Sequence, residues 1–187
     1  AVDWERAIAG RLVGYRLIES VSLVGLHLMI WMRRDTETLK RWPLRHLGRT
    51  AVKTGLRGRH GNKGAVAWRC LLGNTAMCIV NCHLAAGQEN WAARNSDLAT
   101  ISRSISFPWI AGRETCYRSM DDHDLVILFG DLNYRIELPR DRIVSHLREN
   151  DLETLLERDQ LAMNITRCPL LASLKESPIT FNPTYKY

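Results

Sequence analysis

Residues 64–83, GAVAWRCLLGNTAMCIVNCH, decide the fold class of this 187-residue chain. Two apolar stretches, 64–72 and 75–83, flank Gly73-Asn74, and this pattern is typical of a β-hairpin with a short turn. We therefore expect two neighbouring antiparallel strands. The second ends in polar residues. Because side chains alternate along a strand, His83 and Asn81 share a face with Ile79, and the cysteines 78 and 82 face the other side.

Apolar runs on both sides of the hairpin predict further strands. The run VSLVGLHLMIWMR at 21–33 is rich in residues compatible with β-structure and predicts one buried strand. Leu125 to Phe129 predict another, which ends at Gly130-Asp131. Because hairpins join antiparallel strands, the sheets should be at least partly antiparallel.

Helical periodicity appears between and after these strands. Trp91, Leu98, Ile101 and Ile105 recur at helical spacing and predict an amphipathic helix over 89–105. The segments 140–149 and 152–158 predict two shorter helices that are separated by Asn150. Strands mixed with amphipathic helices indicate an α/β chain whose sheets are covered by helices.

Composition narrows the class of protein. A chain of 187 residues with 45% hydrophobic residues and no linker fits one domain with one core, over residues 1–187. Five cysteines without Cys-x-x-Cys spacing favour a reduced intracellular protein, and no apolar run is long enough for a membrane span. A net charge of +6 favours anionic partners, which include nucleic acid, acidic lipid headgroups and phosphorylated small molecules.

The segment Gly130-Asp131-Leu132-Asn133 is the sharpest candidate for chemistry. A carboxylate orients or deprotonates a water, and a carboxamide holds that water or a phosphoryl oxygen. If the chain stays extended, Asp131 and Asn133 point the same way and share one cavity. The alternative is an ordinary turn, because Gly, Asp and Asn are common turn residues.

His83 is the second candidate, at the end of its own apolar strand. An imidazole at that place donates a hydrogen bond to a phosphate oxygen or protonates a leaving group. The alternative is a structural histidine with satisfied hydrogen bonds. Two polar strand ends in an α/β chain can open onto the same crevice, which favours a shared site with Asp131.

Two further segments carry cations. Residues 54–64, TGLRGRHGNKG, combine four glycines with basic side chains and predict a loop whose backbone approaches an anion, or else a mobile basic turn. The segment Asn182 to Tyr187, NPTYKY, fits either phosphate recognition or an ordinary packed turn.

Taken together, these motifs resemble the inositol polyphosphate 5-phosphatase family of the endonuclease/exonuclease/phosphatase superfamily. The resemblance rests on TGLRG with GNKGAVA, NCHLAAGQ with a downstream RNSD, GDLNYRI, and PTYKY, in the order and spacing of the family. Connecting stretches such as LVGLHL, LERDQL and PITFNPTYKY extend it over nearly the whole chain. The sequence of these motifs is most similar to that of fungal and synaptojanin-like members of the family.

The resemblance implies a four-layer sandwich, with two mixed or antiparallel sheets face to face and helices outside. It implies Mg²⁺-dependent, in-line attack of water on the 5-phosphate of a phosphoinositide or inositol polyphosphate, at the surface of membranes facing the cytoplasm. No nucleic-acid partner is expected. Position by position, Asp131 would activate the water, Asn133 would bind that water and the scissile phosphate, and His83 would stabilise the phosphate. The substrate-binding residues would be Asn62, Lys63, Tyr185 and Lys186.

The chain departs from the family at both ends. The metal-binding glutamate of the family would precede residue 1, and a closing Ser-Asp-His segment would follow residue 187, so we expect a partial catalytic domain and assign no metal ligand. Two other functions remain open on the sequence. One is a DNase-like phosphodiesterase that uses the same Asp131, Asn133 and His83, and the other is a non-catalytic module that binds phosphoinositides.

Overall fold

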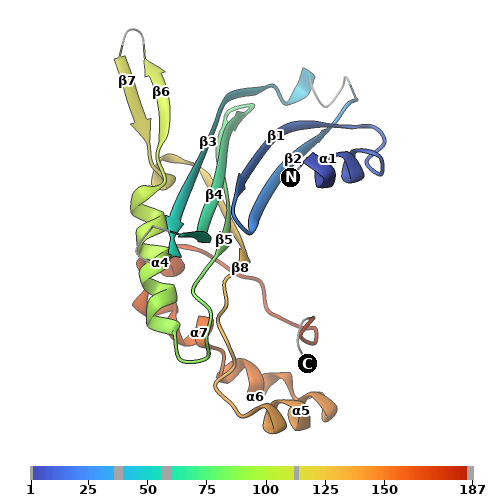
Figure 1. Ribbon diagram of the computed structural model, residues 1–187, viewed down its shortest axis with the longest axis vertical. Coiled ribbons are helices and arrows are strands. Elements are labelled where there is room, and N and C mark those ends of the chain that lie inside the picture. Colours follow the sequence, from blue (N-terminus) through green and yellow to red (C-terminus); the bar gives the residue numbers. More distant parts are fainter. Residues whose placement is uncertain (1, 36–39, 56–59, 112–113, 185–187) are drawn as a thin grey trace. The chain divides into compact units, whose positions relative to one another are not determined.

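A computed structural model describes residues 2–35, 40–55, 60–111 and 114–184 of the chain (Figure 1). The residues form two compact units, of which the first contains 1–84 and 100–132 and the second contains 85–99 and 133–187. All named strands belong to the first unit, and the short helices that follow the last strand belong to the second.

A four-stranded sheet forms the centre of the first unit. Its strands are β3 (Leu44–Thr54), β4 (His60–Leu72), β5 (Thr75–His83) and β8 (Leu125–Asp131), in the order β3-β4-β5-β8. The predicted hairpin is confirmed, since β4 and β5 pair antiparallel with Leu72 opposite Thr75, and Gly73 in the turn has φ +61°. The predicted strand at 125–129 is also confirmed, and it pairs parallel to β5.

The apolar run at 21–33 is not one strand, so that prediction is wrong. It contains the end of β1 (Tyr15–Leu23) and all of β2 (Leu26–Arg33), which pair antiparallel around a turn at Val24-Gly25. Gly25 has φ +79°, a conformation that glycine adopts without the penalty of a Cβ atom. A turn with only one small residue is hard to detect inside a continuous apolar run, because the hydrophobic pattern does not change across it.

The β1–β2 ribbon packs against one face of the four-stranded sheet and makes the core of the unit (Figure 1). Val21, Leu26 and Leu28 of the ribbon meet Val66, Trp68 and Cys70 of β4. Each of these strands alternates inward apolar residues with outward ones, as expected for strands between two layers. The face-to-face pair of sheets confirms the predicted mixed and antiparallel α/β architecture.

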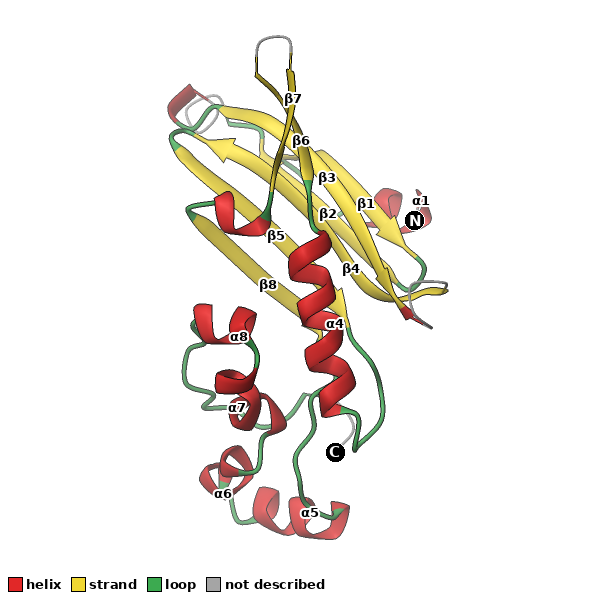
Figure 2. Ribbon diagram, turned by 90° about the vertical axis from the view of Figure 1, so that its left-hand side faces the viewer, coloured by secondary structure: helices red, strands yellow, loops and turns green. Residues whose placement is uncertain are grey.

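Helix α4 (Trp91–Ser104) follows β5 and confirms the predicted helix. Its last residues, which belong to the first unit, lie on the sheet face opposite the ribbon (Figures 1 and 2). Ile101 and Ile105 there are buried, as are Ala67 and Val80 on the strands. The hairpin of β6 (Phe107–Ala111) and β7 (Glu114–Arg118) and the short helix η1 (Met120–Asp122) then lead to β8, and α1 (Val2–Ala9) precedes β1.

The second unit is helical in its later part. It contains α5 (Arg140–Arg148), α6 (Leu152–Glu157), α7 (Gln160–Asn164), η2 (Ile165–Arg167) and α8 (Pro169–Ser173). The first two confirm the predicted helices, and Asn150 between them has φ +56°, which ends the first helix. None of the helices in the described part of the chain is both long and apolar enough to cross a membrane.

Candidate active site at the strand ends

One row of paired residues crosses the four-stranded sheet where β5 and β8 end. Gly64 of β4 is opposite His83 of β5, and His83 is in turn opposite Asp131 of β8. The parallel pairing of β5 with β8 brings their carboxyl ends to the same edge, as the sequence predicted for His83 and Asp131. A histidine and an aspartate 48 residues apart are thereby neighbours.

Glycines next to this row allow the strands to approach each other. A Cβ atom on Gly64, which has φ +142°, would lie 1.9 Å from the Val52 carbonyl oxygen. A Cβ atom on Gly130, which has φ +123°, would lie 2.2 Å from the Cys82 carbonyl oxygen. Only glycine fits both the backbone angle and the space. The glycines of GNKG and GDLN therefore serve close strand contacts.

The GNKG segment lies in a strand and not in a loop, which corrects that prediction. Strand β4 begins at His60, so Asn62 and Lys63 are strand residues, and residues 56–59 of the predicted loop lie outside the described residues. Asn62 is exposed. The pleat of β4 gives each side chain a fixed direction, which a mobile turn would not.

Lys63, His83 and Asp131 form what we call the strand-end cluster. The Lys63 ammonium lies 2.5 Å from His83 Nε2, and His83 Nε2 lies 3.5 Å from Asp131 Oδ2. Because an ammonium only donates, Nε2 accepts in this contact, as it does in a neutral imidazole. The cluster thus combines a cation, a neutral imidazole and a carboxylate.

The surroundings of His83 favour its neutral form. Partial burial lowers the pKa of His83, the positive charge of Lys63 lowers it further, and the carboxylate of Asp131 acts in the opposite direction. The turn between β1 and β2 contributes to this burial, because a Cβ atom on Gly25 would lie 4.0 Å from His83 Nδ1. The side chain of Asp131 is 60% exposed, so its carboxylate is accessible to a ligand.

Asn133 belongs to the second unit, and its backbone breaks the expected alternation. It has φ +58°, so the chain does not stay extended through Asn133, and the condition for a cavity shared with Asp131 is not met. Arg135 donates to Asn133 through Nη2 to Oδ1 at 2.7 Å and through Nε to the carbonyl oxygen at 3.1 Å. Asn133 is 9% exposed. Its carboxamide therefore has a defined orientation.

Tyr185 and Lys186 lie outside the described residues, so their predicted role in substrate binding stays a prediction.

Two functional candidates of the second unit were missed by sequence reasoning: Arg94 and Gln160. Arg94 is fully buried, and its guanidinium donates to the carbonyl oxygens of Ala85, Gly87 and Gln88. Gln160 is 1% exposed and accepts from Arg94 Nη2. The available signals were the RNSD motif, which contains Arg94, and the stretch LERDQL, which contains Gln160; neither was assigned a role.

The other polar residues of RNSD hold the same region. Asp97 Oδ2 accepts from the Ala85 main-chain N–H at 2.9 Å, and Asn95 Oδ1 accepts from the Tyr134 hydroxyl at 2.5 Å. Burial raises the pKa of Tyr134, so this phenol stays protonated and donates. Hydrogen bonds from the RNSD residues therefore hold the loop that follows β5 and the segment that follows β8.

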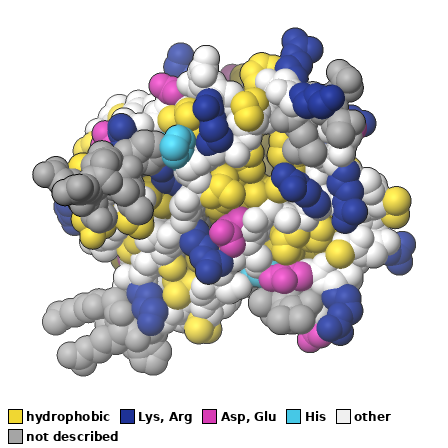
Figure 3. Space-filling view, turned by 90° about the horizontal axis from the view of Figure 1, so that it is seen from above, with side chains coloured by type: hydrophobic (Ala, Val, Ile, Leu, Met, Phe, Trp, Pro, Cys, Tyr) yellow, Lys and Arg dark blue, Asp and Glu magenta, His cyan; other side chains and the backbone are white. Residues whose placement is uncertain are grey.

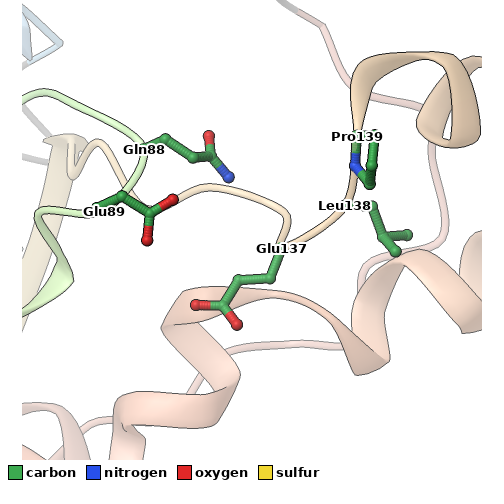
Figure 4. A pocket seen from close by; sticks show the side chains of 5 residues that line it. All are labelled: Gln88, Glu89, Glu137, Leu138 and Pro139. Atoms are coloured by element: carbon green, nitrogen blue, oxygen red, sulfur yellow. The ribbon is translucent and has the colours of Figure 1, made fainter.

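A pocket of about 350 Å³ in the second unit is lined by Gln88, Glu89, Glu137, Leu138 and Pro139 (Figure 4). Its two carboxylates repel an anion, so the pocket does not suit a phosphorylated ligand.

Lys and Arg side chains are spread over the face shown in Figure 3, among hydrophobic and other residues. Net charge alone therefore does not mark a binding surface.

A divalent cation needs several ligand atoms in one place. Among the described residues, no group of three or more His, Cys, Asp or Glu side chains is placed to hold an ion. Asp131 offers oxygen atoms of the kind that Mg²⁺ binds, but it shares its histidine neighbour with the Lys63 ammonium. A complete ligand set for a divalent cation is thus not present in the described part of the chain.

Comparison with known proteins gives consistent matches. Residues 2–187 match the sequence profile of endonuclease/exonuclease/phosphatase family 2. A probable inositol polyphosphate 5-phosphatase of Schizosaccharomyces pombe is 42% identical over 186 residues, which cover 92% of this chain and 15% of the relative. The type I inositol polyphosphate 5-phosphatase 5 of Arabidopsis thaliana is 39% identical over 179 residues, which cover 94% of this chain and 33% of the relative.

A solved structure is also similar. The crystal structure of the inositol polyphosphate 5-phosphatase domain of a synaptojanin, in complex with inositol (1,4)-bisphosphate and a calcium ion, aligns with a TM-score of 0.81 at 36% identity. The alignment covers 100% of this chain and 53% of that one. These matches confirm the resemblance and the fold class inferred from the motifs. The chain spans about half of the solved domain and a third or less of the two curated relatives.

Proposed function

We propose that this chain, which belongs to endonuclease/exonuclease/phosphatase family 2, is part of the catalytic domain of a 5-phosphatase acting on phosphoinositides or inositol polyphosphates. The inositol (1,4)-bisphosphate bound in the similar synaptojanin structure and the names of the relatives support this substrate class.

The observation that carries the proposal is the strand-end cluster. Phosphoryl transfer depends mainly on positioning and on electrostatic stabilisation of the transferring group. A row of paired residues that brings the Lys63 ammonium to 2.5 Å and the Asp131 carboxylate to 3.5 Å from His83 Nε2 supplies both.

In the proposed reaction the water oxygen forms a bond to the 5-phosphorus, and the bond from phosphorus to the ring oxygen breaks. The hydroxyl of the water ends on inorganic phosphate and its proton ends on the ring oxygen. Asp131 would orient and deprotonate the water. Lys63 and His83 would donate to a phosphoryl oxygen, and Asn133 would donate its amide hydrogens to the phosphate or the water.

We further propose Mg²⁺ as the cofactor, with ligands that include groups outside the described residues. The calcium ion of the similar structure supports a divalent cation. Such an ion supplies positive charge to the phosphoryl oxygens when bound.

The proposed partners are phosphorylated. Lys186 and Tyr185 would hold a 4-phosphate, and Asn62 would lie near the substrate or the lipid surface. Peripheral contact with a cytoplasmic membrane surface fits a lipid substrate, and no nucleic-acid partner is proposed.

The test uses the full-length protein that contains this chain. Phosphate release is measured in Mg²⁺ from phosphatidylinositol 4,5-bisphosphate in vesicles, from inositol 1,4,5-trisphosphate, and from analogues that lack the 5-phosphate. We expect release only from substrates with a 5-phosphate. Cleavage of plasmid DNA in the same buffer, without phosphate release from either inositol substrate, would indicate a DNase-like phosphodiesterase instead. Vesicle binding without any hydrolysis would show a non-catalytic module.

A further inference from the structure

A buried polar network occupies the interior of the second unit, and Gln160 is its centre. The Gln160 side chain uses each polar atom twice. Oε1 accepts from Arg94 Nη2 at 2.5 Å and from the Arg135 main-chain N–H at 3.0 Å. Nε2 donates to the Gln88 carbonyl oxygen at 2.9 Å and to Glu137 Oε1 at 3.3 Å. A fully bonded, buried carboxamide has one orientation, because rotation would leave its partners unpaired.

Gln160 hydrogen-bonds both the main-chain N–H and the main-chain carbonyl oxygen of Arg135. Its side chain accepts from the Arg135 N–H, and its own main-chain N–H donates to the Arg135 carbonyl oxygen at 2.9 Å. The guanidinium of Arg135 then holds the Asn133 carboxamide and carbonyl. Contacts therefore run from Gln160 through Arg135 to Asn133.

The left-handed backbone of Asn133 is held by these contacts. Asparagine tolerates φ +58° better than most residues other than glycine, and a strained conformation of this kind persists where its surroundings fix it. With Oδ1 turned to Arg135, the NH₂ group is fixed on the other side of the carboxamide, and an NH₂ group donates to phosphate oxygens.

The same glutamine joins a second functional segment. Arg94, which Gln160 binds, donates to the Gly87 carbonyl oxygen at 2.7 Å and to the Ala85 carbonyl oxygen at 3.2 Å. The loop 85–88 follows His83 directly in sequence after Leu84. One buried side chain therefore links the NCHLAAGQ and GDLNYRI motifs.

We propose that Gln160 is a positioning residue of the hydrolysis, which fixes the Asn133 carboxamide through Arg135 and touches no substrate itself. This inference rests on the proposed function. Misplacement of a reacting group by about 1 Å lowers rates on the order of 10²-fold, so the effect on kcat should be large.

The first experiment compares two variants of the full-length protein. Gln160→Met keeps the length of the side chain but removes both acceptor and donor, and should lower kcat by roughly 10- to 100-fold with little change in KM. Gln160→Glu keeps the acceptor for Arg94 and Arg135 but places a carboxylate oxygen against the Gln88 carbonyl oxygen and Glu137, so its kcat should lie between those of the parent and Gln160→Met. Equal kcat values for these two variants would overturn the proposal.

The matched control is Asn164→Leu. Asn164 is a buried polar residue of the same helix, 3% exposed, and its side chain bonds to Asn95 and to the Gln160 carbonyl oxygen. Asn164→Leu should lower the melting temperature but keep kcat within about threefold. If Gln160→Met does not fold, Arg135→Lys replaces it, because lysine keeps the charge and cannot grip both oxygens of Asn133.

The decisive experiment is a double-mutant cycle. If Gln160 acts through Asn133, then Gln160→Met should cost less than about twofold in kcat when introduced into Asn133→Ala. The same loss in both backgrounds would overturn the proposal.

A second readout separates this inference from the proposed function. If the parent protein hydrolyses no inositol substrate, the proposed function fails. The positioning is then read from the side-chain NH₂ resonances of Asn133, which should shift and exchange faster with water in Gln160→Met. Unchanged resonances would overturn it.

Discussion

The strand-end cluster and the network around Gln160 are both polar, but they are built in opposite ways. In the cluster, the side chain of Asp131 is 60% exposed, and the Lys63 ammonium and the Asp131 carboxylate both approach one nitrogen of the His83 imidazole. In the network, Gln160 and Arg94 are at most 1% exposed and bond mainly to main-chain carbonyls and to each other. A group that must handle a ligand needs accessible donors and acceptors, whereas a group that holds others in place, as Gln160 does, has its polar atoms bonded within the protein.

This difference predicts that the two regions respond differently to substitution. Changes in the cluster should alter rate, affinity and titration while leaving the fold intact. Changes in the network should reduce stability, and alter rate only through the residues it holds.

The largest expected effect is on stability, from Arg94→Leu. Removing a buried guanidinium leaves the carbonyls of Ala85 and Gly87 without their donor, and should lower the free energy of unfolding of the second unit by about 3–5 kcal/mol. Arg142→Leu, at an exposed position on α5 of the same unit, should change it by less than about 0.5 kcal/mol. Urea unfolding of the full-length variants measures both. Similar losses for both arginines would show that the network is no more critical than the surface.

The next effect is on rate. Asp131→Ala removes the carboxylate that handles the water, and should lower kcat on the order of 10²-fold or more. Because the side chain is exposed, the melting temperature should barely change. Phosphate release and thermal unfolding of the same preparation check both halves. A folded variant that keeps most of its turnover would remove Asp131 from the mechanism.

Of these two regions, only the strand-end cluster could be predicted from the sequence. Polar residues at the ends of apolar strands are a local signal, and it identified His83 and Asp131. The burial of Arg94 is not local, because its partner Gln160 is 66 residues away. An arginine and a glutamine in amphipathic helices are usually exposed, so nothing nearby distinguishes the buried ones. Long-range contacts of this kind need the structure.

The fold shows the same limit. The hairpin at 64–83 was predictable because Gly73-Asn74 interrupts two apolar runs. The turn at Val24-Gly25 was missed because the residues around it stay apolar, and the ribbon on either side of it packs on the sheet. The left-handed backbone of Asn133 was missed for a different reason. The contacts that hold it, from Arg135 and behind it from Gln160, cannot be read from the sequence.

A smaller effect on catalysis is expected for Lys186, which lies outside the described residues. Lys186→Ala should weaken kcat/KM for substrates with a 4-phosphate by roughly 1.5–3 kcal/mol, because a charge-assisted contact is lost. A ring that carries only the 5-phosphate should be little affected. Hydrolysis of phosphatidylinositol 4,5-bisphosphate and phosphatidylinositol 5-phosphate by the same variant gives the comparison. Equal losses on the two would indicate a structural lysine.

The smallest effect concerns the charge balance within the strand-end cluster. Burial and the ammonium of Lys63 both lower the pKa of His83, and Asp131 raises it. Lys63→Met should therefore raise the pKa of His83, and Asp131→Asn should lower it further. NMR titration of the imidazole in each full-length variant measures these opposite shifts.

The sign of the effect on stability follows from the lowered pKa. A histidine whose pKa is lower in the folded protein binds its proton more readily in the unfolded chain. Its contribution to stability is therefore present above its ordinary pKa of about 6.5 and is lost as the pH falls below that value. Lys63→Met should make this loss shallower and Asp131→Asn should make it steeper. If neither variant shifted the pKa of His83, burial alone would set its titration. The cluster would then not be the balanced arrangement of charges that distinguishes it from the network around Gln160.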